Sequence, residues 1–373
     1  MRVLAVNAGS AGLKLSLLND DVVEESAELP ADQHGFDVHE LGALLKTWPT
    51  PDAIGHRIAH GGAYYSTPVR VDAAVRDVLY ELSDLAPPHQ ALALAALDAV
   101  AALLPEVGAV ACFDTAFHAG IPAAAATYAV PSDWRERYAV RRYGCHGLSH
   151  AYAAAHAAHL LDRPLHGMRI VTCHLGADAS LAAVLDGRSV DTTTGFTPQE
   201  GLVTATRSGT VDPGLVLWMH EHGGLSVREI TATLRERSGL TALTGTGDMR
   251  AVEAAAARDD RAARLALDVY THRLVGGIAA MAAATGGIDA LVFTGGVGEK
   301  SPTVRQRAAE RLGFLGVFVE RRRNATTRGD GDISTAEAAV RTLVVTARED
   351  LRISQETRKL LERRSGRNGR APV

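Results

Sequence analysis

The chain has 373 residues, of which 46% are hydrophobic and 22% are charged, and its formal net charge is −4. This composition is typical of a folded globular enzyme and excludes a largely disordered chain. A weakly acidic chain without a long run of one charge favours neither nucleic acid nor an anionic membrane as a partner. The length predicts two domains rather than a single core.

The three cysteines, Cys112, Cys145 and Cys173, lie far apart and lack the spacing of metal ligands. A sparse, odd number of cysteines suits a reducing compartment. No uninterrupted apolar run approaches 18 residues, and the sequence enters a predicted strand without an apolar signal region. We therefore expect a cytoplasmic protein.

The first predicted element is a short buried strand at residues 3–6, which leads into the segment "VNAGSAGLKL" at residues 6–15. Gly9 and Gly12 allow a ligand to approach the backbone closely, and Lys14 adds a positive charge that attracts phosphates. By itself, the segment fits either a tight hairpin turn or a phosphate-binding loop.

A second segment, residues 169–190, repeats this organisation. A buried strand runs into a glycine loop, a second strand and a tight turn. Gly9 precedes the Asn19-Asp20 turn by ten residues, and Gly176 precedes the Asp186-Gly187 turn by ten. The repeat predicts two similar units that face each other and grip a nucleotide between them.

A third glycine loop, residues 291–300, also follows a predicted strand, and a helix is expected to begin near Ser301 and Pro302. The loop lacks the glycine spacing of a Walker motif. Alanine-rich segments at residues 92–104 and 261–284 predict amphipathic packing helices.

Four further segments concentrate polar residues. Arg57 lies within "GHRIAHGG", Asp114 ends an apolar strand, His146 lies between two glycines, and Arg207 is exposed among small residues. Open α/β sheets hold their ligands at strand ends such as that of Asp114. The planar fork of each arginine matches carboxylate and phosphoryl oxygens, so the segments together predict an anion-handling site.

These blocks, in this order, resemble the acetate/propionate kinase family of the actin-like, sugar-kinase-like superfamily. The resemblance is carried by "VNAGSAGLK", "GHRIAHGG", "LAPPHQ", "FDTAFH", "RRYGCHGLSH", "CHLG", "GFTPQEGL", "TRSG", "FTGGVGE" and "ARED". It implies an α/β fold of two similar actin-like (ribonuclease H-like) domains with a nucleotide cleft between them. Residues 1–115, completed by a C-terminal helix at residues 351–373, would form the first domain. Residues 116–350 would form the nucleotide-binding domain, which would also join two chains in a homodimer.

The resemblance implies transfer of the γ-phosphoryl group of ATP to a short-chain carboxylate, acetate or propionate, which gives an acyl phosphate and ADP. Mg²⁺ would be the cofactor, held by Asn7 and Glu349. The residues implied as catalytic are Asp114, His146 and Arg207. Those implied for the carboxylate are Arg57, Ala59, Pro88, His89, Cys145 and Pro198. Those implied for the nucleotide and its phosphates are Ser10, Lys14, His174, Leu175, Gly176, Ala177, Asp178, Asp248, Met249, Arg250, Gly296, Val297, Gly298, Glu299 and Lys300.

Asp114 corresponds to a residue that the family assigns to acid/base catalysis. A carboxylate substrate has a reference pKa near ~4 and is already ionised at neutral pH, so no proton has to be removed. We therefore expect Asp114 to orient the magnesium shell or the attacking oxygen. A sugar kinase, whose nucleophile is an alcohol, would need this residue as a base.

The sequence also departs from the family pattern. Ala177 and Asp178 replace the usual Asn-Gly, and the carboxylate is expected to weaken nucleotide binding by repelling the β-phosphate. This departure motivates one alternative, the same acyl chemistry with a different phosphoryl donor such as pyrophosphate. A second alternative is a low-turnover nucleotide-binding protein of the actin-like fold, against which the presence of Arg57, Asp114, His146 and Arg207 argues. Ala59, Pro88 and Cys145 replace the larger Val, Leu and Phe, which predicts room for an acyl chain longer than acetate.

Overall fold

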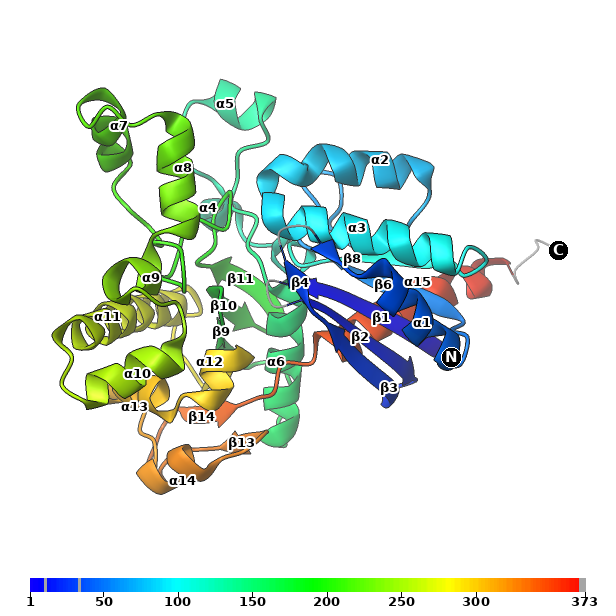
Figure 1. Cartoon of the computed structure of the whole chain (residues 1–373). Helices are drawn as coiled ribbons and strands as arrows, with labels where there is room; N and C mark the ends of the chain where they lie inside the picture. Colours follow the sequence, from blue (N-terminus) through cyan, green and yellow to red (C-terminus); the bar gives the residue numbers. More distant parts are fainter. Residues whose placement is uncertain (10–11, 33–34, 369–373) are drawn as a thin grey trace. The chain divides into compact units, whose positions relative to one another are not determined.

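The computed structural model describes residues 1–9, 12–32 and 35–368, and the chain divides into two compact units (Figure 1). Unit 1 comprises Met1–Ala119, Cys145–Tyr152 and the chain from Arg348 onward, and unit 2 comprises Gly120–Gly144 and Ala153–Ala347. The sequence had placed residues 145–152 in the second domain. The segment belongs to unit 1 because the N–H of Gly147 donates to the carbonyl oxygen of Asp114 and Leu148 packs in a unit 1 core cluster.

Unit 1 is built on a six-stranded mixed sheet of order β3-β2-β1-β6-β8-β7. The first three strands pair antiparallel, β1, β6 and β8 run parallel, and β7 pairs antiparallel with β8. The strands are β1 (Arg2–Gly9), β2 (Gly12–Asn19), β3 (Val22–Leu29), β6 (Ala53–Ile58), β7 (Val69–Arg70) and β8 (Ala109–Phe113). A separate two-stranded hairpin consists of β4 (Ala31–Asp32) and β5 (Gly35–Phe36).

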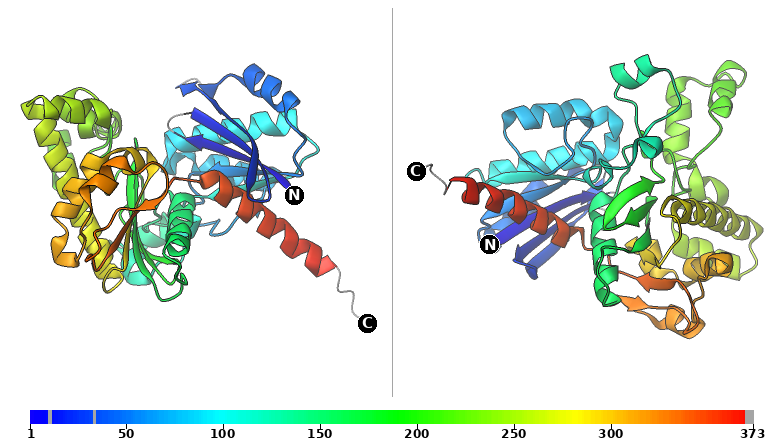
Figure 2. Two further views of the ribbon diagram at one scale, coloured as in Figure 1. Left: turned by 90° about the horizontal axis from the view of Figure 1, so that it is seen from below. Right: turned by 180° about the vertical axis from the view of Figure 1, so that it is seen from behind.

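Helices cover both faces of this sheet. Leu4 and Val6 pack in a core cluster with residues of α3 (Pro87–Leu103), whereas Ala5, between them, packs in a different cluster with residues of α15 (Glu349–Asn368). Because successive side chains of a strand point to opposite faces, α3 and α15 lie on opposite sides of the sheet. Figure 2 shows α15, in red, lying along the strands of unit 1. Unit 1 also contains α1 (Val38–Thr47) and α2 (Ala73–Glu81).

Unit 2 contains a second six-stranded sheet, of order β11-β10-β9-β12-β14-β13. Its first three strands are antiparallel, β9, β12 and β14 run parallel, and β13 pairs antiparallel with β14. The strands are β9 (Arg169–Leu175), β10 (Ala179–Leu185), β11 (Arg188–Thr192), β12 (Ala290–Thr294), β13 (Gly331–Asp332) and β14 (Arg341–Val344). Strand for strand, this is the order and direction of the sheet in unit 1.

The internal repeat predicted from the glycine loops is therefore confirmed. The corresponding hairpins turn at Asp20 and Asp21 and at Asp186 and Gly187, so the first turn lies one residue later than predicted. Asp20, Asp186 and Gly187 have φ values of 53°, 54° and 75°. Positive φ is the backbone conformation that tight hairpin turns require.

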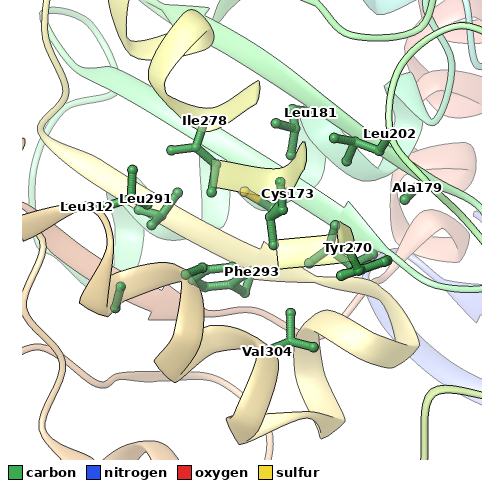
Figure 3. Packing of buried hydrophobic residues seen from close by; sticks show 14 of the residues in the cluster. Cys173, Ala179, Leu181, Leu202, Tyr270, Ile278, Leu291, Phe293, Val304 and Leu312 are labelled. Carbon is green, nitrogen blue, oxygen red and sulfur yellow. The ribbon is translucent and has the colours of Figure 1, made fainter. Parts of the chain in front are cut away.

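The core of unit 2 lies between the sheet and α11 (Arg261–Ala284), which matches the predicted helix at residues 261–284. Figure 3 shows Cys173 and Phe293 from the sheet beside Tyr270 and Ile278 from α11. The remaining helices are α4 (Ala123–Ala126), α5 (Ser132–Arg137), α6 (Gly147–Leu160), α7 (Pro213–Glu221), α8 (Val227–Glu236), α9 (Gly239–Thr244), α10 (Met249–Ala257), α12 (Gly295–Lys300), α13 (Pro302–Glu310) and α14 (Arg321–Thr326). Within the described ranges, no helix is both long enough and apolar enough to cross a membrane.

Candidate active site

The first cluster of predicted site residues lies at the carboxyl ends of the parallel strands of unit 1. Arg57 is near the end of β6, and Asp114 directly follows β8, the neighbouring parallel strand. Nε and Nη2 of Arg57 donate to the same carboxylate oxygen, Oδ2 of Asp114, at 2.8 Å and 2.6 Å. The side chains are 13% and 2% exposed, so the structure holds a largely buried ion pair where open α/β sheets bind ligands.

Arg57 is also tied to the end of the first strand. Its Nη1 donates to Oδ1 of Asn7 at 3.2 Å and to the carbonyl oxygen of Ala8 at 3.1 Å. Burial lowers the pKa of Arg57, but the charge and hydrogen bonds of Asp114 outweigh burial and raise it. The guanidinium is thus a permanent, fixed positive charge.

The glycine segment that begins the chain forms a hairpin whose register extends to Gly9 opposite Gly12. The two residues between them, including the predicted phosphate contact Ser10, lie outside the described residues. Lys14 on β2 is paired with Asn7 on β1, and its Nζ lies 4.0 Å from Oε2 of Glu28. The predicted lysine is exposed and lies beside the predicted metal ligand.

His146 joins this cluster through an unusual backbone conformation. Its φ is 52°, which is uncommon for a residue other than glycine, and strained residues of this kind concentrate at functional sites. Next to it, the N–H of Gly147 donates to the carbonyl oxygen of Asp114 at 3.0 Å. A Cβ on Gly147 would lie 2.1 Å from that oxygen. Only glycine fits here, and this contact brings His146 beside Asp114.

Cys145 lies on the other side of His146. Its Sγ is 3.1 Å from Nδ1 of His146, and its carbonyl oxygen is 3.0 Å from Nε2 of His118. Burial lowers the pKa of His118 to about 4, so that ring is neutral at physiological pH. The neutral His118 ring therefore supports the backbone at Cys145, next to His146.

The other residues predicted for the acyl pocket are distributed over both units. Ala59 and His89 are half-buried in unit 1, as is Cys145, and Pro198 is half-buried in unit 2. Pro88 begins α3 within its first turn, and its side chain is not described.

Sequence reasoning missed Gln90, which is fully buried beside the predicted pocket residues. Its Oε1 accepts from the N–H of His60 at 3.2 Å, and its Nε2 donates to the carbonyl oxygens of His60 and Leu79. These bonds fix the start of α3 against the strand end that follows Arg57. The signal was the glutamine that closes the block "LAPPHQ", a polar residue in the first turn of an otherwise apolar helix.

The residues predicted for Mg²⁺ supply oxygen donors of the kind that this ion prefers. Oδ1 of Asp114 is buried and has no hydrogen-bond partner among the described residues. Oδ1 of Asn7 accepts a hydrogen bond from Arg57, the residue that also pairs with Asp114. Glu349, the first residue of α15, raises the pKa of Arg57 by its charge. In the described chain, no three His, Cys, Asp or Glu side chains form a group that could hold a metal alone. The residues fit Mg²⁺, which usually binds one or two carboxylates and completes its shell with water and phosphate oxygens.

The second cluster lies in unit 2, at the turn between β9 and β10. This turn contains Gly176, Ala177 and Asp178, and it follows His174 and Leu175. A Cβ on Gly176 would be 4.0 Å from the backbone nitrogen of Gly296, so the turn adjoins the start of α12. Leu175 is fully buried in the core, whereas Ala177 is exposed.

Arg207 was expected to be exposed but is buried, and an ion pair joins it to this turn. Its Nη1 lies 2.7 Å from Oδ1 of Asp178, and the two side chains are 10% and 16% exposed. The sequence had predicted that Asp178 would face a phosphate of the nucleotide. In the structure its carboxylate faces the predicted catalytic arginine.

The third glycine loop is not an open loop but the short helix α12, which is followed by the predicted helix at Pro302. Oε1 of Glu299 accepts from the N–H groups of Gly295 at 3.0 Å and Ala347 at 2.9 Å. Glu299 therefore fixes the start of α12. The other predicted contacts differ in exposure, with Gly298 buried, Val297 half-buried and Lys300 exposed.

The last predicted nucleotide segment begins α10. Asp248 caps this helix by accepting from the N–H of Arg250, and the two side chains form an exposed ion pair. Met249 between them is buried in the core of unit 2.

A separate cavity lies elsewhere in unit 2, and no predicted site residue lines it. It occupies about 310 Å³ between α11 and the segments around residues 191–193 and 200–202, with Arg142, Glu200 and His272 in its wall. Glu200 and Arg142 pair with each other at 2.7 Å. Arg142 and Glu200 come from the motif segments "RRYGCHGLSH" and "GFTPQEGL", but the residues predicted to act in catalysis or to bind ligands lie outside this cavity.

The two units share one sheet topology, and each places an Arg–Asp pair close to its first hairpin. Two repeated sheets of this topology fit the class of actin-like folds, which consist of two similar domains.

The comparisons agree with this class. Residues 43–355 match the sequence model of the Acetokinase family. The chain is 41% identical over 397 aligned positions to the acetate kinase of Deinococcus deserti, with 98% of this chain and 99% of that protein covered. The chain belongs to the Acetokinase family.

Solved structures of an acetate kinase and a propionate kinase are also similar to this chain. The structure of Porphyromonas gingivalis acetate kinase is similar with a TM-score of 0.86 and 33% identity, covering 96% of this chain and 99% of that one. A propionate kinase from Francisella tularensis is similar with a TM-score of 0.87 and 32% identity, with the same coverage.

Proposed function

We propose that this protein transfers the γ-phosphoryl group of ATP to a short-chain carboxylate, acetate or propionate, and reversibly forms an acyl phosphate and ADP. The observation that carries this proposal is the buried Arg57–Asp114 pair at the strand ends of a chain of the Acetokinase family. A fixed guanidinium suits a carboxylate substrate because its charge attracts the anion, and the four hydrogen bonds described above leave one of its five N–H groups for a substrate oxygen.

In the proposed mechanism, Arg57 binds and orients the carboxylate, and Asp114 keeps the guanidinium of Arg57 in place. Oδ2 of Asp114 already accepts two hydrogen bonds from Arg57, which supports a positioning role. The substrate arrives ionised, so Asp114 need not accept a proton. Its second oxygen, Oδ1, would help to hold Mg²⁺ together with Asn7 and Glu349. Bound Mg²⁺ supplies charge neutralisation for the phosphate oxygens.

Arg207 stabilises the transferring phosphoryl group, and His146 donates a hydrogen bond to one of its equatorial oxygens. Phosphoryl transfer leaves little covalent chemistry to the protein, so fixed positive charge and donors account for most of the catalysis. His174, Gly176 and Gly296 would contact the phosphates of the nucleotide. The adjoining glycine backbones of the turn and of α12 support this assignment.

The test is an assay that traps acyl phosphate as its hydroxamate, with acetate and propionate as acceptors and MgATP or pyrophosphate as donors. We expect product with MgATP and not with pyrophosphate. Product with pyrophosphate alone would establish the alternative donor, and no product with either would establish the low-turnover alternative. The comparisons favour neither alternative.

We also propose that two copies of the chain form a homodimer through unit 2. Helix α7 has no buried residue, and its apolar Leu215, Leu217 and Trp218 are 49%, 60% and 55% exposed. Such a patch favours an interface. Light scattering coupled to size-exclusion chromatography should give a dimer mass, which Leu217→Asp should reduce to that of a monomer. We further propose a cytoplasmic location, which the three free cysteines support.

A further inference from the structure

Arg207, which belongs to the family motif, forms an ion pair with Asp178, which does not. The family motif usually ends in glycine where this chain has Asp178. The carboxylate lies 2.7 Å from Nη1 of Arg207, and both side chains are mostly buried. A charge pair in such surroundings is screened by solvent far less than a surface pair.

Backbone hydrogen bonds hold both partners in place. The N–H of Gly176 donates to the carbonyl oxygen of Asp178 at 2.8 Å, which closes the β9–β10 turn. The N–H of Ala205 donates to the carbonyl oxygen of Ala177 at 3.1 Å, which joins this turn to the loop that carries Arg207.

The arginine loop is closed in the same way. Thr204 accepts from the N–H of Arg207 through Oγ1 and donates its own N–H to the carbonyl oxygen of Arg207, both at 3.1 Å. A Cβ on Gly239 would lie 2.7 Å from the carbonyl oxygen of Arg207, so the neighbouring chain also confines the loop. The carboxylate and the guanidinium therefore meet across two loops that are already fixed.

We propose that Asp178 is an internal anion that competes with phosphorylated ligands for Arg207 and thereby sets their affinity. This inference rests on the proposed role of Arg207 in phosphoryl transfer. While the pair is intact, the carboxylate offsets the positive charge that an incoming phosphoryl group would meet. A donor must therefore displace the carboxylate or bind to a site of lower net charge, and either reduces its affinity.

The test compares Asp178→Asn, which removes the charge and keeps the shape, with Asp178→Gly, which restores the family residue, and Asp178→Glu, which keeps the charge. We expect the Asn and Gly variants to bind MgATP between about threefold and tenfold more tightly, and to show a KM for MgATP lower by a similar factor. Because the carboxylate opposes ground state and transition state alike, kcat should change less than KM. The Glu variant keeps the charge and should show no comparable gain in MgATP affinity.

Asp268→Asn is the matched control, because Asp268 pairs with Arg307 at 2.8 Å on the surface of the same unit and is 69% exposed. It removes the same charge and should leave MgATP affinity unchanged. Equal tightening in this control would overturn the proposal, since the effect would then follow net charge. If the Gly variant bound MgATP more tightly and the Asn variant did not, the proposal would also be overturned, because the cause would be steric. A fall in kcat with unchanged KM in the Asn variant would make Asp178 a positioning residue instead.

Arg207→Ala separates this inference from the proposed function. If Arg207→Ala retains normal turnover, the proposed role of Arg207 is wrong. If turnover collapses but Asp178→Asn binds MgATP as the unmodified protein does, only the competition is wrong. In the Arg207→Ala background, the Asn substitution should no longer tighten MgATP binding, which is the coupling that a double-mutant cycle detects.

Discussion

At the scale of single residues, the Arg57–Asp114 pair is part of the proposed site, and the loss of one partner would destabilise the fold. Asp114 is 2% exposed, so removal of Arg57 leaves a buried carboxylate without its cation. Breaking a buried pair from one side costs about 3–5 kcal/mol, whereas removing both partners can cost much less.

We therefore expect Arg57→Ala to lower both turnover and the melting temperature. The double variant Arg57→Ala/Asp114→Asn should regain much of the melting temperature and none of the activity. Loss of a preorganised charge should reduce kcat/KM by about 10²- to 10³-fold. Thermal unfolding and steady-state kinetics of both variants check this, and a double variant with restored turnover would contradict the role of Arg57.

The predicted acyl pocket supports a second expectation at this scale. Ala59 and Cys145 are smaller than the residues usual in the family, and an additional buried methylene contributes about 0.8 kcal/mol when it fits. We expect kcat/KM for propionate to be at least equal to that for acetate, and butyrate to be accepted. Cys145→Phe should shift the preference toward acetate by no more than ~10–200-fold, because apolar pockets discriminate weakly. Assays of three acids with both proteins decide the matter, and strong acetate preference in the unmodified protein would refute the pocket argument.

At the scale of elements, the start of α6 depends on one glycine. The Cβ that would lie 2.1 Å from the carbonyl oxygen of Asp114 cannot be accommodated unless the helix start moves. Gly147→Ala should therefore destabilise unit 1 by about 1–3 kcal/mol and displace His146, with a loss of activity. Gly276→Ala on α11 meets nothing within 4 Å and should stabilise its helix by about 0.5–1 kcal/mol. Urea unfolding of the two variants measures the contrast, and equal midpoints would show that the helix start can yield.

Prediction from the sequence succeeded where the signal was local. The α11 helix, the repeated hairpins and the start of a helix near Ser301 and Pro302 followed from periodicity and turn residues. It did not reveal the ion pairs, because Arg57 and Asp114 meet only through the parallel pairing of β6 with β8. Nor did it reveal that the third glycine loop is helical, since three glycines within six residues disfavour a helix. There, tertiary contacts hold the turn: the N–H of Gly295 donates to Glu299, and Arg305 donates to the carbonyl oxygens of Gly298 and Glu299.

At the scale of the whole molecule, buried histidines predict sensitivity to acid. Burial lowers the pKa values of His56, His60 and His118, all in unit 1, to about 4. The unfolded chain, with histidine pKa values near 6.5, binds more protons than the folded chain between pH 6.5 and 4. The contribution of these histidines to the free energy of unfolding should therefore be at its maximum above pH 6.5 and decrease as the pH falls from 6.5 to 4.

His56 offers the cleanest test, because both ring nitrogens are buried without a hydrogen-bond partner among the described residues. Replacement by Leu should reduce the pH dependence of the free energy of unfolding by up to one proton. His166→Gln is the control, since that side chain is 90% exposed. The measurement is urea unfolding at several pH values from 7.5 to 4.5. An unchanged slope in His56→Leu would show that His56 is already protonated in the folded chain.

The position of α15 has a consequence for synthesis on the ribosome. The strands of unit 1 emerge first, yet Leu351 and Ile353, which cover one face of their sheet, emerge last. The nascent sheet must keep that apolar face exposed while the second unit is translated. The strands made first are thus the last to have both faces of their sheet covered. Until α15 packs, the apolar face that it covers is accessible to chaperones and to other nascent chains.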